Sequence, residues 1–240
     1  MKLIFVLLVS ILYMFGTDFN PQNIVIKKID KKTAVIDKGN LTIGKSGIVV
    51  HYFKDKKQMI LTNAIVIKTT NLNSVIKFVD TKLLLQDAIP TTKLKPAVGD
   101  IFVLNHLYYT SLLITPNFEA QNTIKQKYNK NNFIDINIFA ATLRINNIPI
   151  PTQEDIRGYA LKNNIGTIFF YLNQYLYIVD TISFKVIDKQ LINIKDKSKH
   201  TPFFTNVQNI KSGLFSFGKD KIDNFDKYYL NMLGIKNDRK

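Results

Sequence analysis

The sequence predicts an α+β protein in which a small all-β barrel or sandwich is followed by an α+β domain with helices packed on an antiparallel meander. Two observations lead to this prediction. Residues 23–107 hold short β-type segments at close spacing with no helical period, whereas residues 108–192 hold helical patterns and then three more β-type segments. With 240 residues, 46% of them hydrophobic, the chain can bury a core in each part.

The first half reads as strands because its segments are short and rich in Val, Ile, Phe and Thr. The turn-like clusters "DKGN", "KDKK", "NLNS" and "KPAVGD" separate several of them, and the last cluster turns at Gly99. Six strands at this spacing are typical of a small barrel or sandwich. The expected strands cover residues 23–29, 33–36, 46–53, 59–67, 74–79 and 100–104.

In the second half the period changes. A strand at 108–116 precedes three helices at 117–130, 135–145 and 149–164, and the last of these has Thr152 as its N-cap with Glu154 and Asp155 in its first turn. Three strands follow as an antiparallel meander, at 165–172, 174–180 and 183–190. Residues 193–240 then form a polar loop, a C-terminal helix that ends at Gly234, and a basic tail.

The first sixteen residues, "MKLIFVLLVSILYMFG", predict export. Lys2 forms a positive n-region, and the apolar run 3–15 has the length of a signal peptide rather than of a spanning helix, which needs about 20 residues. Gly16 suits a cleavage site and Met14 does not, so this segment is either a signal peptide or a retained N-terminal anchor. The predicted location is the periplasm rather than the cell surface. The chain has no cysteine, which excludes disulfides, thiol nucleophiles and a lipidated N-terminus.

Residues 39–46, "GNLTIGKS", match the G-x-x-x-x-G-K-[ST] pattern of a phosphate-binding P-loop. A functional P-loop leads into a helix, whose N-terminus holds the phosphates. Here Ser46 is followed by "GIVVHYF", a β-type segment, and no apolar strand ending in a Mg²⁺-binding Asp stands out downstream. We therefore expect no nucleotide binding, and we expect Gly44 and Gly47 to form a tight turn or bulge.

No other pattern predicts catalysis, a cofactor or a metal. The histidines His51, His106 and His200 lack metal-binding spacing, and the serines lack a nucleophile-elbow pattern. Asp100 and Asp180 are candidate acids in a cleft, but an aspartate that forms a turn is far commoner. We predict that the protein is not an enzyme and has no catalytic, cofactor or metal site.

The formal net charge is +15, from 33 Lys+Arg against 18 Asp+Glu. Such a balance indicates anionic partners, although lysines scattered among Asn and Ile are also what an AT-rich genome produces. Nucleic acid is not an expected partner, because arginine occurs only at positions 144, 157 and 239. Membrane contact is expected only through residues 1–16, if they are retained.

Several long segments resemble the N-terminal domain of the plasminogen-binding proteins of flagellated ε-type proteobacteria. They include "GKSGIVVHYF", "KPAVGDIFVLNHLYYTSLLITPN" and "PTQEDIRGYALKNNIGTIFFYLNQYLYIVDTISFKVI", and the resemblance runs from about residue 24 to residue 234. It implies an exported envelope protein with no known catalytic activity. The founding members of that family continue into a long Lys-rich extension, which this sequence lacks.

Three classes of function follow from these observations. The favoured one is a non-enzymatic periplasmic scaffold or adaptor in an envelope assembly, such as the periplasmic part of the flagellar motor, with other envelope proteins as partners. The first alternative is a surface-exposed protein that binds host plasminogen, with Lys240 as the candidate contact because a terminal lysine pairs an ammonium with a carboxylate. The second alternative is a binder of cell wall or anionic lipid.

Overall fold

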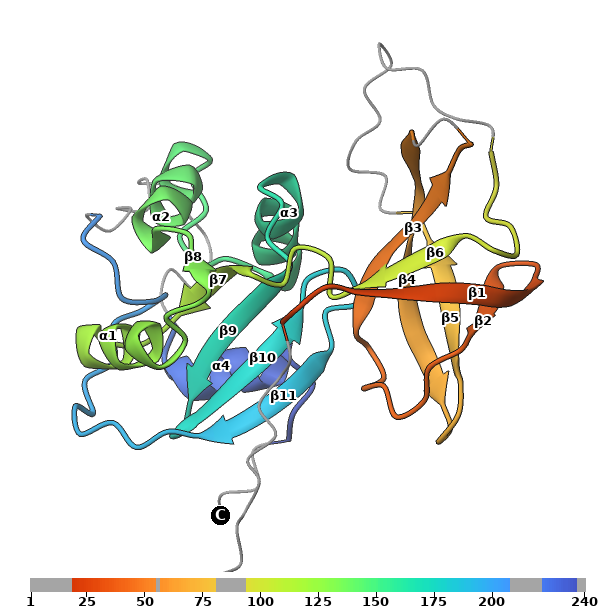
Figure 1. Cartoon of the computed structure of the whole chain (residues 1–240). Coiled ribbons are helices and arrows are strands. Elements are labelled where there is room, and N and C mark those ends of the chain that lie inside the picture. Colours follow the sequence, from red (N-terminus) through yellow and green to blue (C-terminus); the bar gives the residue numbers. More distant parts are fainter. Residues whose placement is uncertain (1–18, 55–56, 81–93, 208–221, 237–240) are drawn as a thin grey trace, which may run out of the picture.

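The computed structural model describes residues 19–54, 57–80, 94–207 and 222–236. It contains a closed antiparallel barrel, a second sheet covered by helices, and a short connection between them (Figure 1). The predicted fold class is therefore confirmed. Within these residues, no helix has the length and apolar character that crossing a bilayer requires.

The barrel is built from β1 (Gln22–Asp30), β2 (Thr33–Ile36), β3 (Ser46–Tyr52), β4 (Gln58–Thr69), β5 (Ser74–Val79) and β6 (Ile101–Leu104). Its strand order is β1-β2-β5-β4-β3-β6, and β1 pairs with β6 to close it. Alternate residues of these strands point inward, so the period-2 pattern of the sequence becomes a filled interior. That interior is packed by buried side chains that include Ile26, Ile36, Val49, Ala64, Val66, Ile76, Phe102 and Leu104.

The second sheet has the order β11-β10-β9-β7-β8. The predicted meander is present as β9 (Thr167–Leu172), β10 (Tyr175–Asp180) and β11 (Val186–Leu191). The sheet differs from a plain meander because β7 (Thr110–Ile114) lies parallel to β9, and the two-residue β8 (Asn132–Phe133) lies parallel to β7. The helices that separate β7 from β9 in the sequence supply the long crossover that a parallel pair needs.

Four helices cover this sheet: α1 (Phe118–Lys127), α2 (Ile136–Ile145), α3 (Gln153–Lys162) and α4 (Phe225–Met232). The N-cap of α3 is Thr152, as the sequence predicts, and it forms a capping box with Asp155. One face of the sheet packs against α2, α3 and α4, and the other packs against Ala120 and Ile124 of α1. Both faces of the strands are therefore buried, which explains the nearly continuous apolar character of β9 and β10.

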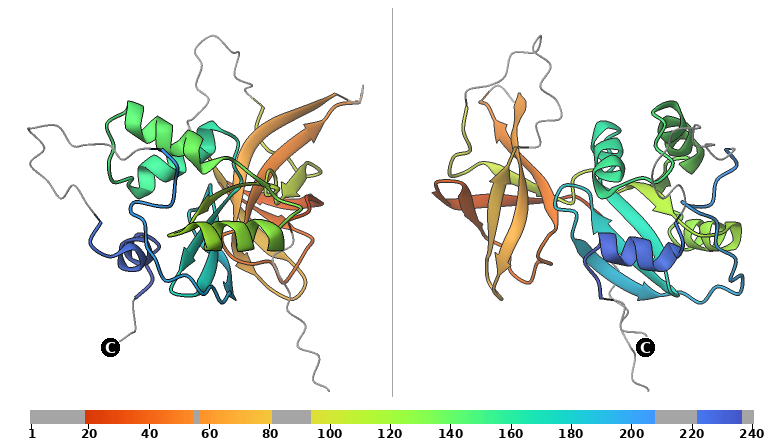
Figure 2. Two further views of the ribbon diagram at one scale, coloured as in Figure 1. Left: turned by 90° about the vertical axis from the view of Figure 1, so that its left-hand side faces the viewer. Right: turned by 180° about the vertical axis from the view of Figure 1, so that it is seen from behind.

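The two parts meet where β6 passes into β7 (Figure 2). The chain turns here through Asn105 and Leu107, which adopt positive φ of 61° and 65°. The backbone N–H of Asn105 donates to the carbonyl of Ser46 at 3.0 Å, so the turn is held to the start of β3. This junction contains a buried polar network that joins the barrel to the second sheet.

Candidate functional site

The junction network is centred on Asp180, which is completely buried at the end of β10. Its Oδ2 accepts hydrogen bonds from the hydroxyl of Tyr108, at 2.7 Å, and from the hydroxyl of Ser46. The Tyr108 hydroxyl also accepts from the backbone N–H of Ser46 at 3.0 Å. Ser46 belongs to the barrel and Asp180 to the second sheet, so this carboxylate joins the two parts of the chain.

Burial determines the protonation behaviour of this network. Loss of contact with water raises the pKa of the Asp180 carboxyl, and the hydrogen bonds that it accepts oppose the rise. Burial also raises the pKa of Tyr108 well above its ordinary value, with a further contribution from the charge of Asp180. Tyr108 therefore keeps its proton at neutral pH and acts as a donor to Asp180.

The turn after β10 adds a second connection between the parts. The backbone N–H of Ser183 donates to Oδ1 of Asp180 at 2.6 Å, and the Ser183 hydroxyl donates to the carbonyl of Gly44 at 2.7 Å. From α3, the Arg157 guanidinium donates to the carbonyls of Thr181 and Ile182 at 3.1 and 2.8 Å. The Ser183 hydroxyl thus holds the turn against the barrel, and Arg157 holds it against α3, with Asp180 at the centre of these contacts.

The P-loop-like segment takes part in this junction. The backbone N–H groups that would hold phosphates already donate within the protein: Gly44 to the Val66 carbonyl at 2.9 Å, Lys45 to the Thr42 carbonyl at 3.2 Å, and Ser46 to Tyr108. Gly44 forms the expected turn, with φ of 99°. The bulge expected at Gly47 was wrong, because the register shift of β3 lies between Val49 and Val50. The hydrogen bonding of the segment supports the expectation that no nucleotide binds.

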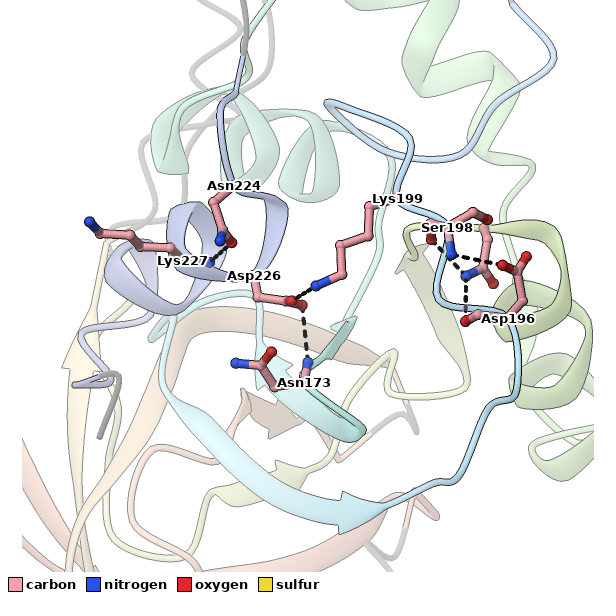
Figure 3. A network of polar contacts seen from close by, with 8 residues as sticks. Asn173, Asp196, Ser198, Lys199, Asn224, Asp226 and Lys227 are labelled. Atoms are coloured by element: carbon pink, nitrogen blue, oxygen red, sulfur yellow. Dashed lines mark hydrogen bonds and ion pairs between the residues drawn. The ribbon is translucent and has the colours of Figure 1, made fainter. Parts of the chain in front are cut away.

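A second polar network surrounds a cavity of about 230 Å³ on the α+β domain (Figure 3). Asp226 at the start of α4 is buried, pairs with the Lys199 ammonium, and accepts from the backbone N–H of Asn173 at 3.0 Å. On the other side, the Asn117 amide donates to the carbonyls of Asp196 and Ser198 at 3.1 and 2.9 Å. The network attaches the 193–204 loop to α1, to α4 and to the β9–β10 turn, so its polar groups serve folding.

Of the candidates named from the sequence, Asp180 is the centre of the junction network, whereas Asp100 and the three histidines form no side-chain hydrogen bond with either network among the residues that the structure describes. His51 Nδ1 lies 2.7 Å from Oδ1 of Asp100, whose other oxygen accepts from the Ala97 N–H at 2.8 Å and closes the turn before β6. His106 is half-buried, which lowers its pKa, and the ring of His200 packs edge-on against Phe204. Over the described part of the chain, no three His, Cys, Asp or Glu residues are placed to hold a metal ion.

The exposed surface carries many lysines, and one of them stands beside an exposed carboxylate. Lys27 Nζ of β1 lies 3.6 Å from Oδ2 of Asp37, which directly follows β2, and both side chains are more than half exposed, at 57% and 66%. Lys27 lies at the register shift of β1, between the pairs Ile26–Ile36 and Lys28–Val35, and Asp37 is one residue beyond Ile36. Residues 1–16 and Lys240, named in the sequence analysis, lie outside the described residues.

The model of the family described as "Plasminogen-binding protein pgbA N-terminal" matches residues 22–233. The chain belongs to this family. The resemblance read from the sequence is thereby confirmed.

Two relatives are proteins named plasminogen-binding protein PgbA, from Helicobacter pylori strains J99 and 26695. Each is 26% identical over 216 residues, which make up 87% of this chain and 47% or 46% of the relative. The chain thus spans about half the length of these relatives. No solved structure matches the chain.

Sequence reasoning named Ser46 and Asp180 but did not connect them, and it gave Tyr108 no role. The sequence contains only a weak indication that Asp180 is a buried, hydrogen-bonded residue. Asp180 ends "YLYIVD", a strand in which a lone carboxylate follows five mostly apolar residues, and such an acid needs partners if it is buried. Nothing in the sequence shows that one partner lies 134 residues away.

Proposed function

We propose that this protein is a non-enzymatic binding protein that binds plasminogen. The observation that carries the proposal is the match of residues 22–233 to a family whose relatives are named for that binding. This was the first alternative of the sequence analysis, and the comparisons support it better than the scaffold. A binding role also agrees with the use of the two polar networks, whose residues hold the fold together.

The contact that we propose is the exposed pair Lys27–Asp37. The lysine-binding sites of plasminogen kringles take an ammonium together with a carboxylate, and this pair presents both on open surface. The pair Lys199–Asp226 does not, because its carboxylate is buried at the start of α4. The solvated pair contributes little to stability, so its substitution tests binding without unfolding the barrel.

Binding to immobilised plasminogen, measured by surface plasmon resonance, tests the function. We expect the full chain to bind and a free lysine analogue to displace it, because the analogue occupies the same kringle sites. If the chain does not bind, or if the analogue fails to displace it, the proposed function is wrong.

Variants of the same chain test the contact separately. We expect Lys27→Gln combined with Asp37→Asn to weaken binding by more than about 1 kcal/mol, the threshold that separates important interface residues from the rest. The matched control is Lys68→Gln, which neutralises another exposed lysine of the barrel. Deletion of Lys240 tests the contact that the sequence suggested. If the Lys27 and Asp37 variant binds normally, the assigned contact is wrong while the function stands.

We also propose that the protein is exported, on the basis of the pattern in residues 1–16. Fusion of residues 1–30 to a reporter that is active only outside the cytoplasm is expected to give signal. The control replaces Leu7 and Leu8 by Asp, which interrupts the apolar run and should silence the reporter. Equal signal from both fusions, or none from the first, would refute export by this segment.

A scaffold role in an envelope assembly remains a prediction of the sequence analysis, and no relative's name supports it. Motility of a strain that lacks the gene distinguishes the two functions. If that strain swims normally but no longer binds plasminogen in a way that a lysine analogue displaces, the proposed function is favoured. If the strain has a motility defect, and the gene with the Lys27 and Asp37 substitutions restores motility, the scaffold is favoured.

A further inference from the structure

The hairpin of β3 and β4 has apolar side chains exposed at its outer end, which reaches beyond the rest of the barrel (Figure 2). We call Tyr52, Phe53, Lys54, Lys57, Met59 and Ile60 the tip residues. The four apolar ones are 36–56% exposed, and the hairpin remains paired up to the hydrogen bond from the Phe53 N–H to the Lys57 carbonyl at 2.8 Å. The hairpin is therefore ordered where it exposes these side chains.

The apolar side chains lie on both faces of the hairpin. Met59 is opposite His51, and the His51 and Phe53 rings are 4.7 Å apart on that face. Tyr52 and Ile60 belong to the other face, because Tyr52 pairs with Gln58 and Ile60 pairs with Val50. Apolar side chains are therefore exposed to water on both faces of the hairpin.

Positive charge accompanies this apolar surface. Lys54 and Lys57 flank the apolar positions, and the sequence from 54 to 57, "KDKK", has three lysines and one aspartate. The whole segment 23–107 has 14 lysines, six aspartates and no arginine or glutamate, which gives a net charge of +8 (14 minus 6). Its surface is thus attracted to an anionic partner.

We propose that the tip residues dock into the headgroup layer of an anionic lipid membrane. The headgroup layer surrounds a shallowly inserted hairpin, so it covers both apolar faces, whereas a protein groove of ordinary depth covers one. Tyr is enriched at this depth, and Phe inserts its ring at the boundary of headgroups and acyl chains. Each lysine near an anionic surface contributes about 1 kcal/mol of attraction. Membrane contact is then a property of the barrel, in addition to the contact expected of residues 1–16.

A single tryptophan tests the proposal locally, since the chain contains none. In the full chain, the emission of Phe53→Trp is expected to move to shorter wavelength with vesicles of phosphatidylcholine and phosphatidylglycerol, and to stay unchanged with phosphatidylcholine alone. The control is Leu72→Trp, at an 80% exposed position in the β4–β5 turn. The readout is local to the probe, so it is independent of how residues 1–16 meet the vesicle.

The lysines are tested by vesicle titration of the same tryptophan variant. Lys54→Gln with Lys57→Gln is expected to weaken partitioning about thirtyfold, which is the effect of two lysines at about 1 kcal/mol each. Lys68→Gln with Lys162→Gln, which removes two exposed lysines remote from the tip, is expected to have a much smaller effect. The proposal is overturned if anionic vesicles leave the Phe53→Trp emission unchanged, if Leu72→Trp shifts equally, or if both lysine pairs have the same effect. Circular dichroism confirms that each variant is folded.

Discussion

Asp180→Ala is expected to lower the free energy of unfolding by about 3 kcal/mol or more. The substitution removes the acceptor of three donors: the hydroxyls of Ser46 and Tyr108 and the backbone N–H of Ser183. Each buried donor left without a partner costs about 1–3 kcal/mol, and relief of the buried charge offsets only part of that sum. Urea unfolding followed by circular dichroism measures the loss, and a change below about 1 kcal/mol would show that the network does not stabilise the junction.

Asp180→Asn is the matched control, because it keeps the size of the side chain and one acceptor oxygen while removing the charge. The folded pKa of Asp180 is raised, so its contribution to stability is fully present below the unfolded pKa of about 4 and declines as pH rises through the folded pKa. Relative to Asp180→Asn, the wild-type protein should therefore become less stable as pH increases above about 4. Unfolding curves of both proteins across the acidic and neutral range measure this difference. A wild-type protein that gains stability over the variant in that range would contradict the raised pKa.

Gly47→Ala is expected to destabilise the barrel by about 3 kcal/mol, at the upper end of the usual cost of overpacking. A Cβ at Gly47 would lie 2.1 Å from the carbonyl oxygen of Val103 on β6 and 2.9 Å from the Cα of Leu104. These are backbone atoms of the paired strand, so they cannot move aside as a flexible side chain does. The strands β3 and β6 must separate locally and lose hydrogen bonds of the closed barrel.

The same substitution at Gly158 provides the control. Gly158 lies inside α3, and a Cβ there would meet nothing within 4 Å. Because alanine has less conformational freedom to lose in a helix, Gly158→Ala is expected to stabilise the protein by about 0.5–1 kcal/mol. Midpoints of thermal unfolding for the two variants should shift in opposite directions. Equal shifts would mean that the close approach of β6 to Gly47 does not cause the loss of stability in Gly47→Ala.

The local elements of this fold could be predicted because their causes lie within a few residues of one another. Thr152 and Asp155 are three residues apart and cap the same helix end. The inward positions of β1, such as Ile24 and Ile26, follow the two-residue alternation of a strand. The β8 pairing was missed because two residues are too few to show a period.

The sequence by itself determined the two-part α+β organisation, because strand and helix periods repeat along the chain. It also determined the membership in the family, because the resemblance extends over most of the chain. The tertiary structure alone decided the use of the individual polar residues. "GNLTIGKS" has the letters of a P-loop, yet its N–H groups are occupied because "GIVVHYF" continues as a barrel strand rather than as a helix. Ser46 meets Asp180 across 134 residues, and Lys27 meets Asp37 at a register shift between two strands. Such contacts result from the combined packing of many segments, and no single stretch of sequence encodes them.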